Sequence, residues 1–215
     1  MDSPKRIPRI GWVIAFIAAT ALLGMVWVNL KGTRPSDKQA LPVLATVPEF
    51  SFTSQTGKTV TREDLLGKIW VANFIFTRCP GPCPMMTSRM AELQAAVEKA
   101  GGNVHLVSVS VDPEHDTPEV LTKYGERFGA NPQWWTFLTG PRAQIDEFVT
   151  KGMLLPLARD GEGVPTHSQK FLVIDEEGRI RSFHELDDGE LIPKVLMDIG
   201  ALIREASKKK TTTGS

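Results

Sequence analysis

The sequence predicts an α/β fold in which helices cover both faces of a mostly parallel sheet. Three observations indicate it: a β-α-β-α-β-α alternation over residues 69–152, an apolar first strand at 69–77, and a hairpin pattern at 171–183. Strands that alternate with helices imply a parallel sheet with buried strands. The chain has 215 residues and 41% hydrophobic composition, which suits one domain with a real core plus an appendage.

Each element has a local signal. Residues 50–53 alternate in polarity, residues 55–58 form a turn, and Thr61 with Asp64 resembles a capping box for a short helix. Buried-face spacing then predicts a helix over 84–100. The remaining expected elements are strands at 104–111 and 134–138, helices from Pro118 to Gly129 and from Pro141 to Gly152, hairpin strands at 171–174 and 179–183, and a last helix through 191–202. The hairpin adds an antiparallel edge, which makes the arrangement thioredoxin-like.

A membrane-spanning helix is predicted before this domain. Residues 10–30 contain no charge, and 21 residues at about 1.5 Å each cross the hydrocarbon core of a bilayer. Trp12 and Trp27 lie near its ends, and three basic side chains in residues 1–9 predict a cytoplasmic N-terminus. A cleaved signal ending at 19–21 is the alternative, but the apolar run continues to Leu30, which favours a retained anchor.

The predicted organisation follows from this anchor. Residues 31–46 have no periodicity and read as a linker, residues 47–206 form the thioredoxin-like domain, and residues 207–215 read as a disordered tail. The protein is therefore expected in the inner membrane with a single span and an extracytoplasmic, periplasmic domain. A formal net charge of zero argues against a nucleic-acid partner.

The only two cysteines, Cys79 and Cys83, follow the first strand of the alternation. Thiolates at positions i and i+4 can form a disulfide or bind a soft ion such as Cu(I). A purely structural disulfide is disfavoured because so small a loop removes little chain entropy. Outside the cytoplasm, a working dithiol also needs a reductant. Cys83 precedes a helix, whose N-terminal partial charge predicts an acidic thiol, and the prolines at 80, 82 and 84 predict a stiff loop.

Other candidate side chains have simpler interpretations. Asp112, Glu114 and Asp116 lie among prolines and read as turn and cap residues rather than as a hard-metal cluster. His105, His115 and His184 are expected to make ordinary hydrogen bonds. Helical spacing predicts that Met86 and Met90 pack in the core, whereas Met85 could contact the thiol site.

Three segments resemble the Sco/SenC family: CPGPCP at 79–84, SVDPEHDTP at 110–118, and His167-Ser168 before an apolar strand. The resemblance covers about residues 46–204. It implies a thioredoxin-like fold and a copper site formed by Cys79, Cys83 and His167. It also implies a metallochaperone, more than an enzyme, that delivers copper to the dinuclear site in cytochrome c oxidase subunit II or to another extracytoplasmic acceptor.

The residue chemistry agrees with this ligand set, since two thiolates satisfy Cu(I) and an added imidazole nitrogen suits Cu(II). One position departs from the family pattern: many members have an acidic residue where this chain has Gly81. Two alternatives remain open. The protein could be a thiol-disulfide oxidoreductase that reduces the acceptor's cysteines through Cys79, as the resemblance implies for some members, or a redox or copper sensor.

Overall fold

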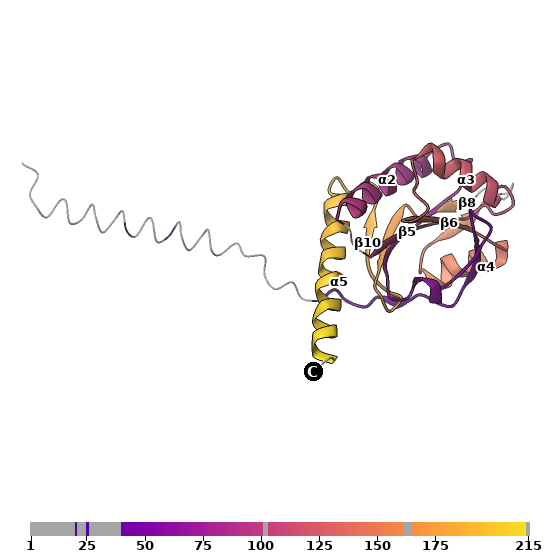
Figure 1. Ribbon diagram of the computed structural model, residues 1–215. Helices are drawn as coiled ribbons and strands as arrows, with labels where there is room; N and C mark the ends of the chain where they lie inside the picture. Colours follow the sequence, from indigo (N-terminus) through magenta and orange to yellow (C-terminus); the bar gives the residue numbers. More distant parts are fainter. Residues whose placement is uncertain (1–19, 21–24, 26–39, 101–102, 161–164, 214–215) are drawn as a thin grey trace, which may run out of the picture. The chain divides into compact units, whose positions relative to one another are not determined.

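The computed structural model describes residues 20, 25, 40–100, 103–160 and 165–213, which Figure 1 draws in colour. Residues 40–213 carry all the strands described below. In chain order the elements are β1 (Ala45–Thr46), β2 (Ser51–Ser54), β3 (Thr59–Thr61), the short helix η1 (Glu63–Leu65), β4 (Ile69–Ile75), α2 (Pro82–Ala100), β5 (Val104–Ser110), α3 (Pro118–Arg127), β6 (Trp135–Thr139), α4 (Arg142–Glu147), the π-helical turn η2 (Phe148–Gly152), β7 (Leu157–Arg159), β8 (Pro165–His167), β9 (Lys170–Ile174), β10 (Arg179–Glu185) and α5 (Leu191–Thr213).

The central sheet is mixed, which corrects the prediction of a mostly parallel one. Its eight strands lie in the order β1-β10-β9-β4-β5-β6-β2-β3. Among the described strands, the pairings β4 with β5 and β5 with β6 are parallel, because a helix crosses over between them. The hairpin β9–β10 returns antiparallel to β4, and the hairpin β2–β3 pairs antiparallel with β6. Both flanks of the parallel centre are therefore antiparallel.

Helical segments cover both faces of the sheet, as predicted. Asn73 and Phe74 are neighbours on β4, so their side chains point to opposite faces. Phe74 packs against Phe148 of η2, with ring centroids 6.4 Å apart. On the other face, a serine hydroxyl links Asn73 to Trp135 of β6, and the next residue on that face of β6 packs against Tyr124 of α3. Figure 1 shows α2 and α3 along one side of the sheet.

Helix α2 buries one stripe of its surface and begins at Pro82, one residue before Cys83. Its core residues recur at helical spacing and are fully buried or nearly so: Cys83, Met86, Met90, Leu93 and Val97. A hydrogen bond of 3.0 Å from Gln94 to the carbonyl of Gly129 links α2 to the end of α3. The predicted core roles of Met86 and Met90 are confirmed, and Met85 is 61% exposed.

Helix α5 extends to Thr213, beyond the last predicted apolar position at 202 and into the predicted tail. Its last turns are polar, so apolar periodicity does not reveal them. Lys209 forms an ion pair of 2.6 Å with Glu177 of the β9–β10 turn and lies 3.8 Å from Glu205 one turn earlier. These contacts account for helix where a disordered tail from residue 207 is predicted.

The predicted membrane span at 10–30 lies, apart from Thr20 and Met25, outside the described residues. Within the described part of the chain, no helix combines the length and the apolar composition that crossing a bilayer requires.

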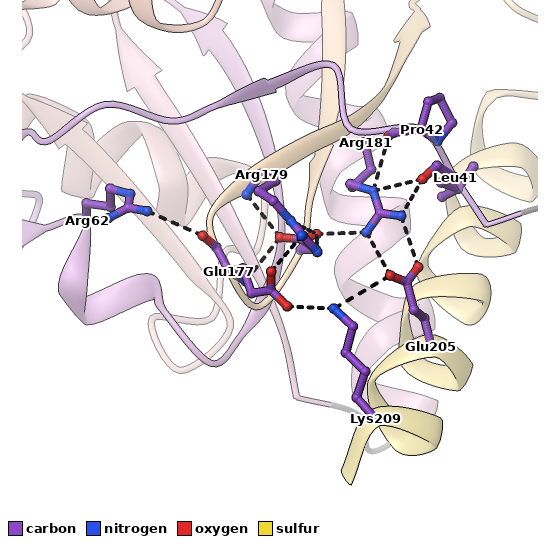
Figure 2. A network of polar contacts seen from close by, with 9 residues as sticks. Leu41, Pro42, Arg62, Glu177, Arg179, Arg181, Glu205 and Lys209 are labelled. Carbon is purple, nitrogen blue, oxygen red and sulfur yellow. Dashed lines mark hydrogen bonds and ion pairs between the residues drawn. The ribbon is translucent and has the colours of Figure 1, made fainter. Parts of the chain in front are cut away.

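A buried network of charges joins the start of the domain to α5 (Figure 2). Arg181 of β10 is 3% exposed, and its guanidinium pairs with Asp175 at 2.8 Å and with Glu205 at 2.9 Å. It also donates to the backbone carbonyls of Leu41 and Pro42. A single side chain therefore connects the incoming chain, the β9–β10 hairpin and α5.

His105 on β5 predicts a specific pH dependence of stability. Burial, assisted by the charge of Lys68, lowers the pKa of His105 to about 4 from 6.5. Between these values the unfolded chain binds a proton that the folded chain does not, so stability falls as the pH drops through this window. His105→Gln can keep the 2.9 Å hydrogen bond to Thr136. From about pH 7 to about pH 4.5 this variant should lose about 2 kcal/mol less stability than the wild type.

Urea unfolding at the two pH values measures this difference. Equal losses for the two proteins would show that His105 is not the titrating group.

Candidate metal centre

The two cysteines lie together where β4 leads into α2. Cys79 lies in the loop and is half-buried, whereas Cys83 lies in the first turn of α2 and is 0% exposed. Both are free thiols, and Cys79 is close enough to contribute to the raised pKa of Cys83. The backbone N–H of Phe76, the residue after β4, donates to the sulfur of Cys83 at 3.5 Å. The structure thus brings together the two sulfurs that the sequence predicts, in the reduced state.

The predicted acidity of Cys83 is wrong. Burial raises the pKa of the Cys83 thiol, and the neighbouring Cys79 and the carboxylate of Asp116 act in the same direction. The hydrogen bond from Phe76 opposes them and is too weak to reverse the shift. Because a thiolate in a solvent-excluded position has lost its hydration, Cys83 stays a neutral thiol until a cation or a disulfide replaces its proton.

Two buried carboxylates hold the residues that lead to Cys79. Asp112 is 0% exposed and accepts from Nε of Arg78 at 2.6 Å, with His115 at 3.2 Å on its other oxygen. Asp116, also 0% exposed, accepts from the backbone N–H of Thr77 at 3.1 Å and from its hydroxyl at 2.6 Å. These aspartates therefore lie within the site, and are not only turn and cap residues.

The residue that caps α3 is the one after Asp116, and not one of the three acidic residues predicted as turn and cap residues. Thr117 is the N-cap of α3, and its hydroxyl accepts from the N–H of Val120 at 3.4 Å. The contact of Asp116 with the loop after β4 could have been predicted from the parallel arrangement of β4 and β5. Parallel strands β4 and β5 end at the same edge of the sheet, so side chains that follow β5 meet the loop that follows β4.

A hydroxyl pair supports the first turn of α2. The hydroxyl of Thr87 donates to the carbonyl of Cys83 at 2.8 Å. Because this uses its only proton, the Tyr124 hydroxyl, 2.9 Å away, is the donor to Thr87. Burial raises the pKa of Tyr124 to about 12, so the phenol keeps the proton that this contact requires. Helix α3 thereby fixes the backbone at Cys83.

His167, the third predicted ligand, lies at the end of β8. Its backbone pairs with Leu157 in the two-stranded β7–β8 sheet, a hairpin that the sequence analysis does not predict. Arg159 of β7 donates to the carbonyl of Val111 at 2.9 Å, directly after β5. This contact holds the hairpin at the edge of the main sheet where the cysteine loop lies. The side chain of His167 lies outside what the structure describes.

Among the described side chains, no group of three His, Cys, Asp or Glu residues is placed to hold a metal ion. The other three histidines make ordinary hydrogen bonds, as predicted. Their partners are Thr136 for His105, Asp112 for His115, and Asp198 for His184.

This arrangement defines a class: a thioredoxin-like protein with a reduced dithiol between a central strand and the helix that follows it. Comparison with known proteins identifies the family. The SCO1/SenC family model matches residues 38–203, and the chain belongs to this family. The "SCO1 protein homolog" of Bacillus subtilis is 36% identical over 141 residues, which cover 65% of this chain and 73% of that protein.

Solved structures agree with this assignment. A SCO1/SenC family lipoprotein from Bacillus anthracis is 32% identical with a TM-score of 0.72, covering 75% of this chain and 97% of that one. BsSco, a Sco protein with an identified disulfide switch, is 30% identical with a TM-score of 0.69, covering 76% and 98%. ScoI of Bradyrhizobium japonicum, solved with copper bound, is 28% identical with a TM-score of 0.62, covering 74% and 99%.

Proposed function

We propose that this protein carries copper on Cys79, Cys83 and His167 and delivers it to the dinuclear site in subunit II of cytochrome c oxidase. The observation that carries the proposal is the pair of adjacent, reduced thiols at the end of β4. Relatives in the same family have been solved with copper bound, and BsSco belongs to the cytochrome c oxidase assembly proteins. We further propose that residues 10–30 hold the domain at the extracytoplasmic face of the inner membrane.

The ligand set suits a cargo that has to be both held and released. Two thiolates satisfy Cu(I), and an imidazole nitrogen gives a set that Cu(II) also accepts. Copper is expected to leave by ligand exchange, in which thiolates of the acceptor replace those of this chain one at a time. The copper ion then never becomes free in solution. Binding requires loss of the Cys83 proton, which the bound cation compensates.

The substitution His167→Ala tests the third ligand. We expect Cu(II) binding to fall by about 10- to 100-fold, while Cu(I), which two thiolates can hold, is retained more strongly. An anaerobic titration of the reduced full chain with Cu(I), and a parallel titration with Cu(II) followed by its sulfur-to-copper absorption, measure both. His184→Ala is the matched control, because His184 lies on β10 and pairs with Asp198 of α5. Equal Cu(II) binding by His167→Ala and the wild type would remove His167 from the ligand set.

A second candidate function is reduction of the acceptor's cysteines, favoured by the unequal exposure of the two thiols. Cys79 is the accessible one, so its thiolate attacks the acceptor disulfide and forms a mixed disulfide. Cys83 then attacks Cys79, which releases the acceptor as a dithiol and leaves an oxidised pair here. A thiol reductant would return the two electrons. In cells lacking the endogenous protein, a His167→Ala chain that restores the oxidase would favour this function over copper delivery.

A further inference from the structure

Three hydrogen-bond donors converge on the buried carboxylate of Asp116. Two come from Thr77, its backbone N–H and its hydroxyl, and the third is the hydroxyl of Ser110 at 2.5 Å. Ser110 in turn accepts from the N–H of Asp112 at 3.1 Å, which orients its own proton toward Asp116. Each carboxylate oxygen therefore has at least one partner, and Thr77 is bound through backbone and side chain together.

Asp116 is itself fixed by rigid elements. Its N–H donates to the carbonyl of Asp112 at 3.0 Å, Ser110 is the last residue of β5, and Thr117 caps α3. Through Asp116, Thr77 is therefore held in a fixed position relative to the sheet and to α3. The contact of Asp112 with Arg78 differs from that of Asp116 with Thr77. It joins Asp112 to the end of a long side chain that is 40% exposed, and it does not involve the backbone of Arg78.

Thr77 precedes Cys79 by two residues, and the N–H of Cys79 closes a turn onto the carbonyl of Phe76 at 3.3 Å. Cys83 is placed separately, from α2 and α3. We propose that Asp116 is a positioning residue for the dithiol: by holding Thr77 it sets where the Cys79 arm of the loop lies relative to Cys83. This inference deepens the proposed function, and its test by copper affinity rests on that function.

The chemistry of Asp116 allows hydrogen bonding to be separated from charge. In Asp116→Asn, the amide oxygen can take the place of Oδ2 and accept from the Thr77 N–H and from Ser110, while the amide NH₂ faces the Thr77 hydroxyl, which can accept. All three contacts are kept and the charge is lost. Asp116→Ala removes all three. Thr77→Val removes one, and Thr77→Ser is its matched control because it restores the hydroxyl.

Two readouts test the proposal on the full chain. One is Cu(I) affinity against a competing chelator, together with the sulfur-to-copper absorption of the Cu(II) form. The other needs no metal: the equilibrium with oxidised dithiothreitol, in which two thiols here give two electrons and two protons to the reagent and form one S–S bond. Asp116→Ala should lower the Cu(I) affinity about tenfold. It should also shift the dithiol equilibrium about fivefold toward the thiols.

Asp116→Asn and Thr77→Ser are expected to stay near the wild type, with Thr77→Val between them and Asp116→Ala. Glu114→Ala, in the same loop and paired only with Arg142 among the described side chains, should change neither readout. The proposal is overturned if Asp116→Ala matches the wild type in both readouts, or if Asp116→Asn fails as badly as Asp116→Ala. Should Asp116→Ala not fold, the comparison of Thr77→Val with Thr77→Ser tests the proposal instead.

A wild type that binds no copper would refute the proposed function. The positioning role of Asp116 would then be tested by the dithiol equilibrium alone.

Discussion

Replacing Cys83 with serine should reduce the affinity for Cu(I) by more than about 100-fold. Losing a residue that only hydrogen-bonds to a metal ligand already costs about 10- to 100-fold in affinity, and Cys83 is itself a proposed ligand. The hydroxyl of serine is a hard ligand that does not ionise near neutral pH, so the soft cation loses one of its two thiolates. Cys83 is 0% exposed, which leaves no room for solvent to supply a substitute ligand. Anaerobic competition with a Cu(I) chelator measures the change.

The fold should tolerate this substitution. The N–H of Phe76 that donates to the Cys83 sulfur can donate to a serine oxygen instead, so the new polar atom has a partner. Met85→Leu is the control, because it removes an exposed thioether two residues away and leaves both thiols. Stoichiometric, tight Cu(I) binding by a folded Cys83→Ser chain would contradict the proposed copper site.

Replacing Arg181 with alanine should lower the free energy of unfolding by about 3–5 kcal/mol. The substitution leaves Asp175, 5% exposed, without one of its two arginines, and leaves Glu205 facing the gap. It also removes the donor that the carbonyls of Leu41 and Pro42 share (Figure 2). Losing one partner of a buried ionic network costs more than the network contributes, because the remaining charges stay desolvated.

Urea unfolding of the two proteins measures this loss. Arg89→Ala is the matched control: Arg89 pairs with Glu92 at 2.9 Å, but both side chains are about half exposed, so its loss should stay within about 0.5 kcal/mol. Comparable small effects for both variants would mean that the Arg181 network contributes no more than a surface pair.

Acid titration gives an independent view of the same network. Burial acts to raise the pKa of Asp175, but hydrogen bonds from Arg179 and Arg181 outweigh it and the pKa is lowered. The stabilisation by Asp175 is therefore present above the ordinary carboxyl pKa near 4 and is lost as the pH falls through the lower folded value.

Local sequence patterns predict the centre of this fold correctly, and its edges less well. The buried stripe of α2 and the apolar strand β4 follow from spacing alone, because each element's pattern is complete within its own residues. The antiparallel pairing of β9 with β4 and of β2 with β6 depends on contacts between distant segments, so alternation of strands and helices could not predict it. The polar end of α5 depends on ion pairs with another segment and has no local signal of its own.

The candidate site shows the same division. Cys79 and Cys83 lie together because only three residues separate them, between the loop after β4 and the first turn of α2, and the sequence shows this short spacing directly. The acidity expected for Cys83 is wrong because the helix terminus is visible in the sequence, whereas the depth of burial depends on how α2 packs. Asp116 reads locally as a turn residue, and only the shared edge of β4 and β5 relates it to Thr77.

For the proposed copper delivery, the unequal depth of the two sulfurs implies an order of events. Of the two sulfurs, Cys79 is the one an approaching partner can reach, so its bond to the ion would be exchanged before the bond to Cys83. Halfway through, the ion would bridge two polypeptides, anchored on one side at the start of α2. A partner offering a single donor would stall at this stage, so productive release selects acceptors that present at least two donors in succession.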